Sequence, residues 1–294
     1  MHSNQHIGKL SVWAGLVLVG GCFLAAALQG TDTPATPASG GDAAGSALTP
    51  VTHTLRLEEE RVWVRIYQRP GLELNFVNLH DNENTSVEAA KTYISRHGGR
   101  LVELEHGRGR TVVIRRDGVL HRFDPNRMFT ESGLRRSLDY FHNLSEENFA
   151  LAADFARHVT GLIGLQQDKP VIAVHNNTQG KLTIHDFKPG EWYGEDTRDI
   201  FINPSEDPDD FFFTNSPALF RALESMRYNV ALMVEQPPDR GSLGNLVDRL
   251  GGVYVLVEAE HGHLSRQVAM LEDLGRLLSG LLGQPTTNPD STYR

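Results

Sequence analysis

The chain has 294 residues, of which 39% are hydrophobic and 22% are charged, and its formal net charge is −9 at pH 7. This composition supports a packed core and excludes a chain that is disordered throughout. The acidic balance, without a dense stripe of Lys and Arg, gives no support to nucleic-acid binding. The single cysteine, Cys22, cannot form an intrachain disulfide, so a metal site would have to be built from His, Asp and Glu.

An apolar run from Leu10 to Leu28 follows a short polar start. It predicts an export signal or a single membrane anchor over residues 1–29, and hydropathy leaves both open. Val19–Cys22 has the pattern of a weak lipoprotein signal, in which Cys22 would carry the lipid, and small residues later in the run also fit ordinary cleavage. We therefore expect an exported protein, either periplasmic or attached to the membrane through this segment.

The composition changes after the apolar run. Residues 30–52 are rich in Thr, Pro, Ala, Ser and Gly, which cannot bury enough apolar surface to offset chain entropy, so they predict a disordered linker. The folded domain is expected over residues 53–285, followed by a flexible tail at 286–294.

The folded part alternates strands with helices, which is the pattern of an α/β domain. Alternating or short apolar runs predict strands at Arg61–Gln68, Leu72–Leu79, Val112–Ile114, Val119–Phe123, Val171–Val174, Asn229–Val234 and Val253–Val257. Helical spacing of apolar residues predicts helices at Ser86–His97, after a cap at Ser145, and at Leu264–Leu282. The Asp117-Gly118 pair predicts a hairpin.

Several of these strands are apolar throughout, as expected when helices cover both faces of a sheet. We predict a single α/β domain with a mixed, mostly parallel central sheet flanked by helices. Ligand sites in such sheets gather beyond the carboxyl ends of the strands. His80, His175 and Glu258 each follow a predicted strand directly, so we expect their side chains to meet at one edge of the sheet.

His80 and Glu83 are three positions apart on a turn after a strand, from which both side chains can reach one ion. A catalytic zinc needs three protein ligands and an open position, and His175 is well placed as the third ligand. Two nitrogens and one carboxylate suit Zn²⁺ better than Mg²⁺ or Ca²⁺, which prefer oxygen. A His-x-x-Glu pair alone is a weak signal that more often marks a solvated turn, and the second histidine strengthens the case for a metal only modestly.

Four segments resemble motifs of the zinc carboxypeptidase superfamily, with most similarity to its aspartoacylase and succinylglutamate desuccinylase branch. They occur in the family's order, at Leu79–Glu83, Asp124–Phe129, Val174–Thr178 and Val257–Glu260. They are similar, in turn, to the family's His-x-x-Glu zinc turn, its Asn-Arg motif, its third-ligand strand and the strand with its catalytic glutamate. The resemblance spans most of residues 72–282 and implies a zinc carboxypeptidase-like fold.

The resemblance implies a general base in the fourth segment, acting on a water activated by zinc. Glu258 and Glu260 are two positions apart and face the same side of a strand, so either can be that base. The position directly after the apolar strand favours Glu258. The family branch has a glycine soon after its glutamate, whereas here Glu260 and His261 precede Gly262, so the branch's substrate is not carried over.

The resemblance also implies that Asn126 and Arg127 bind a substrate carboxylate. Stabilisation of the oxyanion needs a further donor, for which Arg122 or Arg116 is available. The expected activity is zinc-dependent hydrolysis of an amide or peptide bond next to a free carboxylate. Its expected substrate is a small peptide or an N-acyl amino acid.

Two other functions fit the same residues: a non-catalytic metal- or peptide-binding protein on this fold, and a zinc esterase or deacetylase. Bound zinc without turnover would favour the binding protein. The acidic segment Asn203–Asp210 either rims the pocket, favouring basic substrates, or forms a solvated loop. His261 and His263 either add to the metal site or cap a helix. Gly107–Arg110 lacks the third glycine of a dinucleotide fingerprint.

Overall fold

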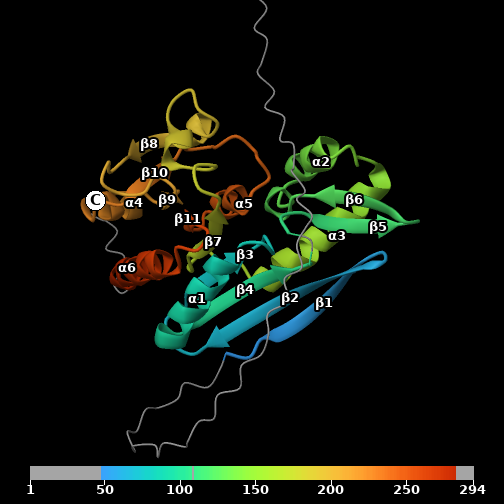
Figure 1. Cartoon of the computed structure of the whole chain (residues 1–294), viewed down its shortest axis with the longest axis horizontal. Helices are drawn as coiled ribbons and strands as arrows, with labels where there is room; N and C mark the ends of the chain where they lie inside the picture. Colours follow the sequence, from blue (N-terminus) through green and yellow to red (C-terminus); the bar gives the residue numbers. More distant parts are fainter. Residues whose placement is uncertain (1–47, 108, 283–294) are drawn as a thin grey trace, which may run out of the picture. The chain divides into compact units, whose positions relative to one another are not determined.

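The computed structural model describes residues 48–107 and 109–282 of the chain (Figure 1). The strands are β1 (Val51–Leu57), β2 (Glu60–Arg69), β3 (Asn75–Asn78), β4 (Gly99–Glu105), β5 (Val112–Arg116), β6 (Val119–Phe123), β7 (Val171–Asn177), β8 (Thr197–Phe201), β9 (Phe211–Thr214), β10 (Asn229–Met233) and β11 (Tyr254–Glu260). The α-helices are α1 (Asn84–His97), α2 (Glu131–Tyr140), α3 (Glu146–Ile163), α4 (Pro217–Ser225), α5 (Leu243–Arg249) and α6 (Leu264–Leu282). Short 3₁₀ turns are η1 (Pro125–Arg127), η2 (Ile184–Phe187) and η3 (Gly194–Asp196).

The main sheet has nine strands in the order β1-β2-β4-β3-β7-β11-β9-β10-β8. The pairs β4–β3, β3–β7, β7–β11 and β9–β10 are parallel, and the other neighbouring pairs are antiparallel. The predicted α/β domain with a mixed sheet is confirmed, with the parallel strands at its centre and antiparallel pairs toward its edges. Parallel pairing accounts for half of the neighbouring pairs.

Two separate apolar cores cover the two faces of this sheet, because alternate residues of a strand point to opposite faces. One core packs the sheet against α3, α5 and the β5–β6 hairpin; its members include Val77, Ala173, Phe211, Phe123, Phe155, Val159 and Val247. The other packs it against α1, α4 and α6; its members include Phe76, Val174, Val257, Tyr93, Ile94, Phe220 and Leu274. Figure 1 shows α1 and α6 near each other, apart from α3.

The residues of the first face continue toward the carboxyl ends of the central strands. Ala173 lies in the first core, so His175 and Asn177 follow it on the same face of β7. The parallel register pairs His175 with Glu258 and Asn177 with Glu260. Polar side chains of two neighbouring strands therefore stand in two successive rows on one face.

Several local signals behave as predicted. Ser145 accepts a hydrogen bond from the Asn148 backbone N–H and begins α3. The helix α1 ends at His97, before Gly98, whose φ of 82° is accessible to glycine at low cost. The Asp117-Gly118 hairpin joins β5 to β6, which form a separate two-stranded sheet.

Other boundaries differ from the predictions. β7 and β11 run past their apolar segments, so His175 and Glu258 lie inside strands rather than directly after them. Each strand has a hydrogen-bonded neighbour beyond the apolar run, which keeps the polar residues extended. β1 begins at Val51, so the last two residues of the predicted linker belong to the sheet.

The predicted export signal or anchor at 1–29 and the tail at 286–294 lie outside the described residues, as does most of the predicted linker. Within residues 48–107 and 109–282, no helix is both long enough and apolar enough to cross a membrane.

Candidate metal centre

His80, Glu83 and His175 converge at the carboxyl ends of β3 and β7. His80 Nδ1 lies 2.8 Å from Glu83 Oε1, and His175 Nδ1 lies 2.7 Å from Glu83 Oε2. All three residues are buried, and a ligand atom from each lies within 4.8 Å of the others. The structure thus brings together the three residues that the sequence predicted as zinc ligands.

Local hydrogen bonds hold the turn that carries two of these ligands. The Glu83 N–H donates to the His80 carbonyl oxygen over 3.1 Å, and Glu83 itself precedes α1. The Ser86 N–H donates to Asn176 Oδ1 over 2.6 Å, and Asn78 Nδ2 donates to the Val174 carbonyl oxygen over 3.2 Å. These bonds tie the His80–Glu83 turn to β7, which fixes it relative to His175.

Asp124, directly after β6, supports the first histidine. Its Oδ1 lies 2.9 Å from His80 Nε2, so one ring nitrogen of His80 faces Glu83 and the other faces Asp124. A carboxylate on the far nitrogen of a ligating histidine fixes its tautomer and orientation. His175 lacks this support, because its buried Nε2 has no hydrogen-bond partner among the described residues.

The charges of this group compensate one another. Burial works against the ionised form of Glu83, but His80 and His175 outweigh it and hold the pKa of Glu83 below its ordinary value. Burial likewise opposes the ionised form of Asp124, and His80 holds the pKa of Asp124 well below its ordinary value. In return, although burial disfavours its charged form, the Glu83 carboxylate raises the pKa of His80.

This donor set fits a zinc ion. Both Nδ1 atoms already face the two oxygens of one carboxylate, so a cation can take the place of the hydrogens in these two contacts. Two imidazole nitrogens and a carboxylate are a common catalytic zinc set, and Asp124 supplies the expected outer partner for one of them. Among the candidate metal-binding groups of the described residues, this group contains two histidines, and each of the others contains at most one.

Glu258 stands beside this group on β11. Its Cα pairs with that of His175, its side chain is 3% exposed, and no described residue donates a hydrogen bond to its carboxylate. Burial, and then the neighbouring Glu83 carboxylate, raise the pKa of Glu258 well above its ordinary value. A carboxyl group with a raised pKa is suited to accepting and returning a proton near neutral pH.

Glu260, the other candidate base, has different neighbours. Its carboxylate lies with those of Asp207 and Asp209, and a ligand oxygen from each lies within 4.8 Å of the others. The two glutamates face the same side of β11, as the sequence predicted, but only Glu258 pairs in register with His175.

Asn126 and Arg127 lie in η1, which follows Asp124. Arg127 Nη2 donates to Tyr193 Oη over 3.3 Å, and the side chain is half-buried. Asn126 Oδ1 accepts a hydrogen bond of 3.2 Å from the Leu243 N–H at the start of α5. Asn126 therefore uses its oxygen to hold the turn. Arg127 Nη1 also donates to the Asn126 carbonyl oxygen over 3.2 Å, and Arg127 Nε donates to no described residue.

Close backbone packing fastens this turn to the loop before α5. The Phe129 N–H donates to the Gly241 carbonyl oxygen over 3.0 Å. A Cβ at Gly133 would lie 2.2 Å from the Gly241 Cα, so neither glycine can be replaced without moving the backbone. Asp239 strengthens the same contact by accepting a hydrogen bond of 2.8 Å from Thr130 Oγ1.

The structure places a different arginine at the metal group from those that the sequence suggested. Arg110 Nη1 lies 3.2 Å from Glu83 Oε1, and Arg110 Nε lies 3.6 Å from Asp124 Oδ2. Arg116 instead pairs with Glu147 at 2.6 Å, at the start of α3. Arg122 is exposed on β6 and forms no ion pair with a described residue.

Sequence reasoning missed the roles of Arg110 and Asp124. Asp124 belongs to the segment that resembles the Asn-Arg motif, but the sequence did not predict its contact with His80. Arg110 follows Gly109 in a loop, and nothing in its sequence context distinguishes it from Arg116 or Arg122. His261 and His263 lie outside the group; His261 Nδ1 is 3.5 Å from Thr85 Oγ1.

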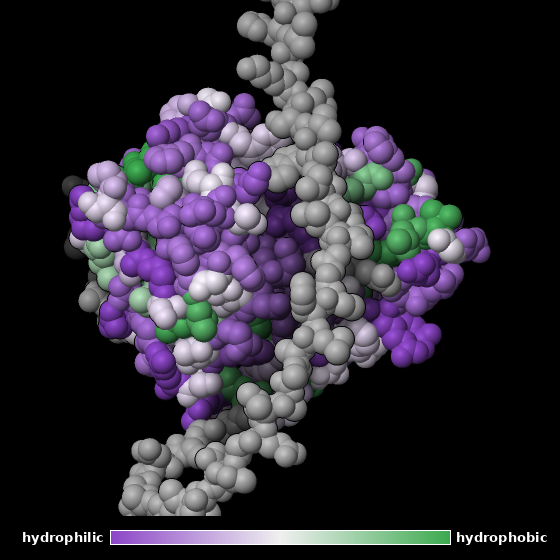
Figure 2. Space-filling view, viewed as in Figure 1, coloured by the Kyte–Doolittle hydropathy of each residue, from purple (hydrophilic) through white to green (hydrophobic). Residues whose placement is uncertain are grey.

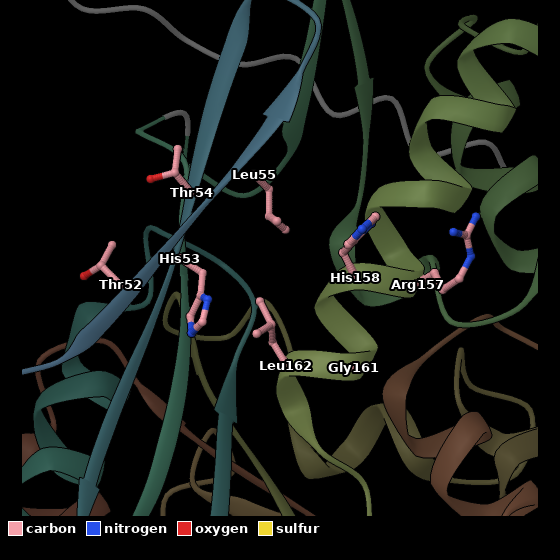
Figure 3. Close-up of a pocket in the computed structure, with 8 residues that line it drawn as sticks. All are labelled: Thr52, His53, Thr54, Leu55, Arg157, His158, Gly161 and Leu162. Carbon is pink, nitrogen blue, oxygen red and sulfur yellow. The ribbon is translucent and has the colours of Figure 1, made fainter.

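A cavity lies away from this centre, between β1 and α3 (Figure 3). His53 and Leu55 from the strand face Leu162 and His158 from the helix. No zinc-ligand candidate lines it. On the face seen in Figure 2, hydrophilic residues dominate the described surface and hydrophobic residues lie in small separate patches.

Comparison with known proteins gives limited guidance. No protein-family model matches the chain, and no curated protein matches it. Among solved structures, it is similar to a proposed metallopeptidase from Shewanella denitrificans, with 15% identity, a TM-score of 0.39, and coverage of 79% of this chain and 84% of that chain. A proposed metallopeptidase from Shewanella baltica shows 13% identity and a TM-score of 0.40, with coverage of 79% and 85%.

The N-formylglutamate amidohydrolase from Ralstonia eutropha shows 13% identity and a TM-score of 0.33, with coverage of 74% of this chain and 96% of that chain. At these identities and TM-scores, the likenesses assign neither a family nor an activity. The case for a function therefore rests on the residues themselves.

Proposed function

We propose that this protein is an exported zinc-dependent hydrolase that cleaves an amide or peptide bond next to a free carboxylate. The observation that carries the proposal is the convergence of His80, Glu83 and His175, with the buried Glu258 carboxylate on the neighbouring strand. The four motifs that resemble the zinc carboxypeptidase superfamily, with its aspartoacylase and succinylglutamate desuccinylase branch, support the same assignment.

His80, Glu83 and His175 would hold the zinc ion. When bound, zinc lowers the pKa of a coordinated water and polarises a carbonyl group. Glu258 accepts a proton from the attacking water and returns it to the leaving amine, for which its raised pKa is suited. Arg110, beside Glu83 and Asp124, is placed to stabilise the negative charge that develops on the carbonyl oxygen.

The carboxylate specificity rests on Arg127. Its guanidinium offers planar donors that match a carboxylate, and the Asn126–Leu243 hydrogen bond fixes the turn that presents it. Burial raises the pKa of Tyr254, so its hydroxyl stays neutral and can donate a hydrogen bond. Small peptides and N-acyl amino acids carry the free carboxylate that Arg127 would bind.

The proposal is tested with the purified full-length chain. Zinc is measured by elemental analysis, and a library of peptides and N-acyl amino acids is screened with wild type, Glu258→Gln and Glu260→Gln. We expect zinc in all three proteins, with turnover in wild type and Glu260→Gln but not in Glu258→Gln. Bound zinc without turnover by wild type would favour a non-catalytic binding protein. Turnover of esters alone would favour an esterase or deacetylase.

A further inference from the structure

Two buried oxygen atoms lack partners at the far ends of β7 and β11. Asn177 and Glu260 are register partners on these parallel strands, one row beyond His175 and Glu258. Asn177 Oδ1 and Glu260 Oε2 are buried, and neither accepts a hydrogen bond from a described residue. The nearest cationic nitrogen in an ion pair with Glu260 Oε2 is His263 Nε2, at 4.0 Å, which is beyond hydrogen-bond distance. A bound cation or water is a common partner of such buried acceptors.

The orientation of the Asn177 amide is fixed. Its Nδ2 donates to the Leu182 carbonyl oxygen over 2.8 Å and to the Asp209 carbonyl oxygen over 3.1 Å. Exchanging the amide nitrogen and oxygen would turn an acceptor toward two acceptors, so the unpartnered atom is the oxygen. Asn177 is 8% exposed, and its amide lies against the segment that carries Asp209.

Two carboxylates from the neighbouring loop lie close to Glu260. Ligand oxygens of Asp207, Asp209 and Glu260 lie within 4.8 Å of one another. The Gly180 N–H donates to Asp209 Oδ1 over 2.8 Å and holds this side chain in place. Asp209 and Asp210 are each 3% exposed, so the hypothesis of a solvated loop is wrong for these two residues.

Nearby cations do not neutralise this group. Arg266 pairs with Glu206 and lies 3.7 Å from Asp210 Oδ2, but no Lys or Arg among the described residues forms an ion pair with Asp207, Asp209 or Glu260. Burial, and the carboxylates of Asp207 and Glu260, raise the pKa of Asp209 to about 6, even though the Gly180 N–H opposes this shift. The group therefore carries negative charge that a divalent cation would neutralise.

We infer that Asp207, Asp209, Glu260 and Asn177 Oδ1 bind a calcium ion at a site distinct from the zinc group. The donors are all oxygen, which favours a hard cation over zinc. Opposite ligands of calcium lie about 4.6–5.2 Å apart, which suits carboxylates that lie within 4.8 Å of one another. Asp207 is only half-buried, which leaves room for water ligands. The ion would tie the Asp207–Asp210 loop to β11, next to Glu258.

The test is a calcium titration of the full-length, zinc-loaded protein after other divalent ions have been removed. Isothermal titration calorimetry should show one Ca²⁺ per chain, with a Kd of about 10⁻⁶–10⁻³ M, and Mg²⁺ should bind at least about tenfold more weakly. Saturating Ca²⁺ should also raise the Tm.

Variants locate the ion. Asp209→Asn keeps an oxygen that can accept from Gly180, yet it should raise the Kd for Ca²⁺ at least tenfold and abolish the Ca²⁺-dependent rise in Tm. Glu260→Gln should have the same effect, which guards against misfolding of one variant. Glu206→Gln is the matched control from the same loop and should leave the Kd within twofold. Glu83→Gln should lose zinc and still bind Ca²⁺. The calcium inference and the zinc proposal can therefore fail independently of each other.

Two results would overturn the inference. The first is the absence of both calcium-dependent heat and a Tm shift in wild type, a measurement that needs no variant. The second is binding of lysine amide or arginine amide, abolished by Asp209→Asn, without any binding of Ca²⁺. That outcome would assign the group to a cationic substrate side chain.

Discussion

The His80–Glu83–His175 group and the Asp207–Asp209–Glu260 group lie one strand row apart, and their chemistry differs because their neighbours differ. Each group contains a buried carboxylate, Glu83 in the first and Asp209 in the second. Burial acts to raise both pKa values: at Glu83 the imidazoles of His80 and His175 outweigh it and lower the pKa, whereas at Asp209 burial, with the neighbouring carboxylates, raises the pKa to about 6. The comparison shows that nearby charges of opposite sign can reverse the pKa shift that burial alone would cause.

The largest expected effect comes from Glu83→Gln. This change removes one zinc ligand and the shared acceptor of both histidine Nδ1 atoms. We expect a loss of zinc affinity well beyond the roughly 10–100-fold that follows loss of an outer partner, with activity at background. Elemental analysis and turnover assays measure both. Normal zinc content in this variant would remove Glu83 from the ligand set, and Asp209→Asn should keep its zinc.

Glu258→Gln should separate catalysis from metal binding. We expect kcat to fall by roughly 10²–10⁴-fold, because the general base is lost, with zinc content unchanged. Glu260→Gln, two residues along the same strand, is the matched control and, assayed without Ca²⁺, should change kcat only slightly. Equal losses in both variants would contradict the assignment of the base to Glu258.

Arg127→Ala should affect substrates with a free carboxylate. Charged hydrogen bonds contribute about 1.5–3 kcal/mol, so KM for the free acid should rise roughly 10–100-fold, and KM for the corresponding amide should change little. Steady-state kinetics on matched acid and amide substrates make the comparison. Arg122→Ala, an exposed arginine on β6, should alter neither value. A similar rise for both substrates would exclude carboxylate binding by Arg127.

Asp124→Asn should weaken zinc binding more modestly. The asparagine keeps an oxygen for the Asn126 N–H but removes the negative charge beside His80 Nε2. Competition with a chelator should show an affinity about tenfold lower. Unchanged affinity would mean that the carboxylate only positions the backbone of η1.

The smallest effects are changes in stability with pH in the metal-free protein. A raised folded-state pKa gives stability below the ordinary value that is lost as the pH rises through the folded value. The contribution of Asp209 to the free energy of unfolding should therefore be lost as the pH rises from 3.8 to about 6. The contribution of His80 should be lost as the pH rises further, above 6.5. Denaturant unfolding with EDTA at several pH values measures both. Asp209→Asn should remove the first loss only, and an unchanged profile would contradict the assignment.

The candidate metal ligands could be predicted from the sequence because each one stands on a turn or strand that the local pattern of residues predicts. His80 and Glu83 share one turn, and apolar strands lead to His175 and Glu258. Parallel strands bring their carboxyl ends to one edge, so neighbours in space could be expected from strand ends alone.

The rest of the centre depends on contacts between distant segments. Arg110 contacts Glu83 from a loop with no hydrophobic period. That Arg110 makes this contact, and not Arg116 or Arg122, depends on how the β5–β6 hairpin packs against the rest of the domain. The burial of Asp209 likewise contradicts its composition, since an acidic, proline-rich segment predicts solvent exposure. Strands β4 and β9 were not predicted because their pairing depends on neighbours far away in the chain.

The close contact between Gly133 and Gly241 leaves no space for a side chain beside the turn that carries Arg127. The metal ligands depend on β3 and β7, whereas Arg127 depends on this separate glycine contact. A larger residue at either glycine would therefore shift the backbone that carries Arg127 and leave the strands that carry the metal ligands in place.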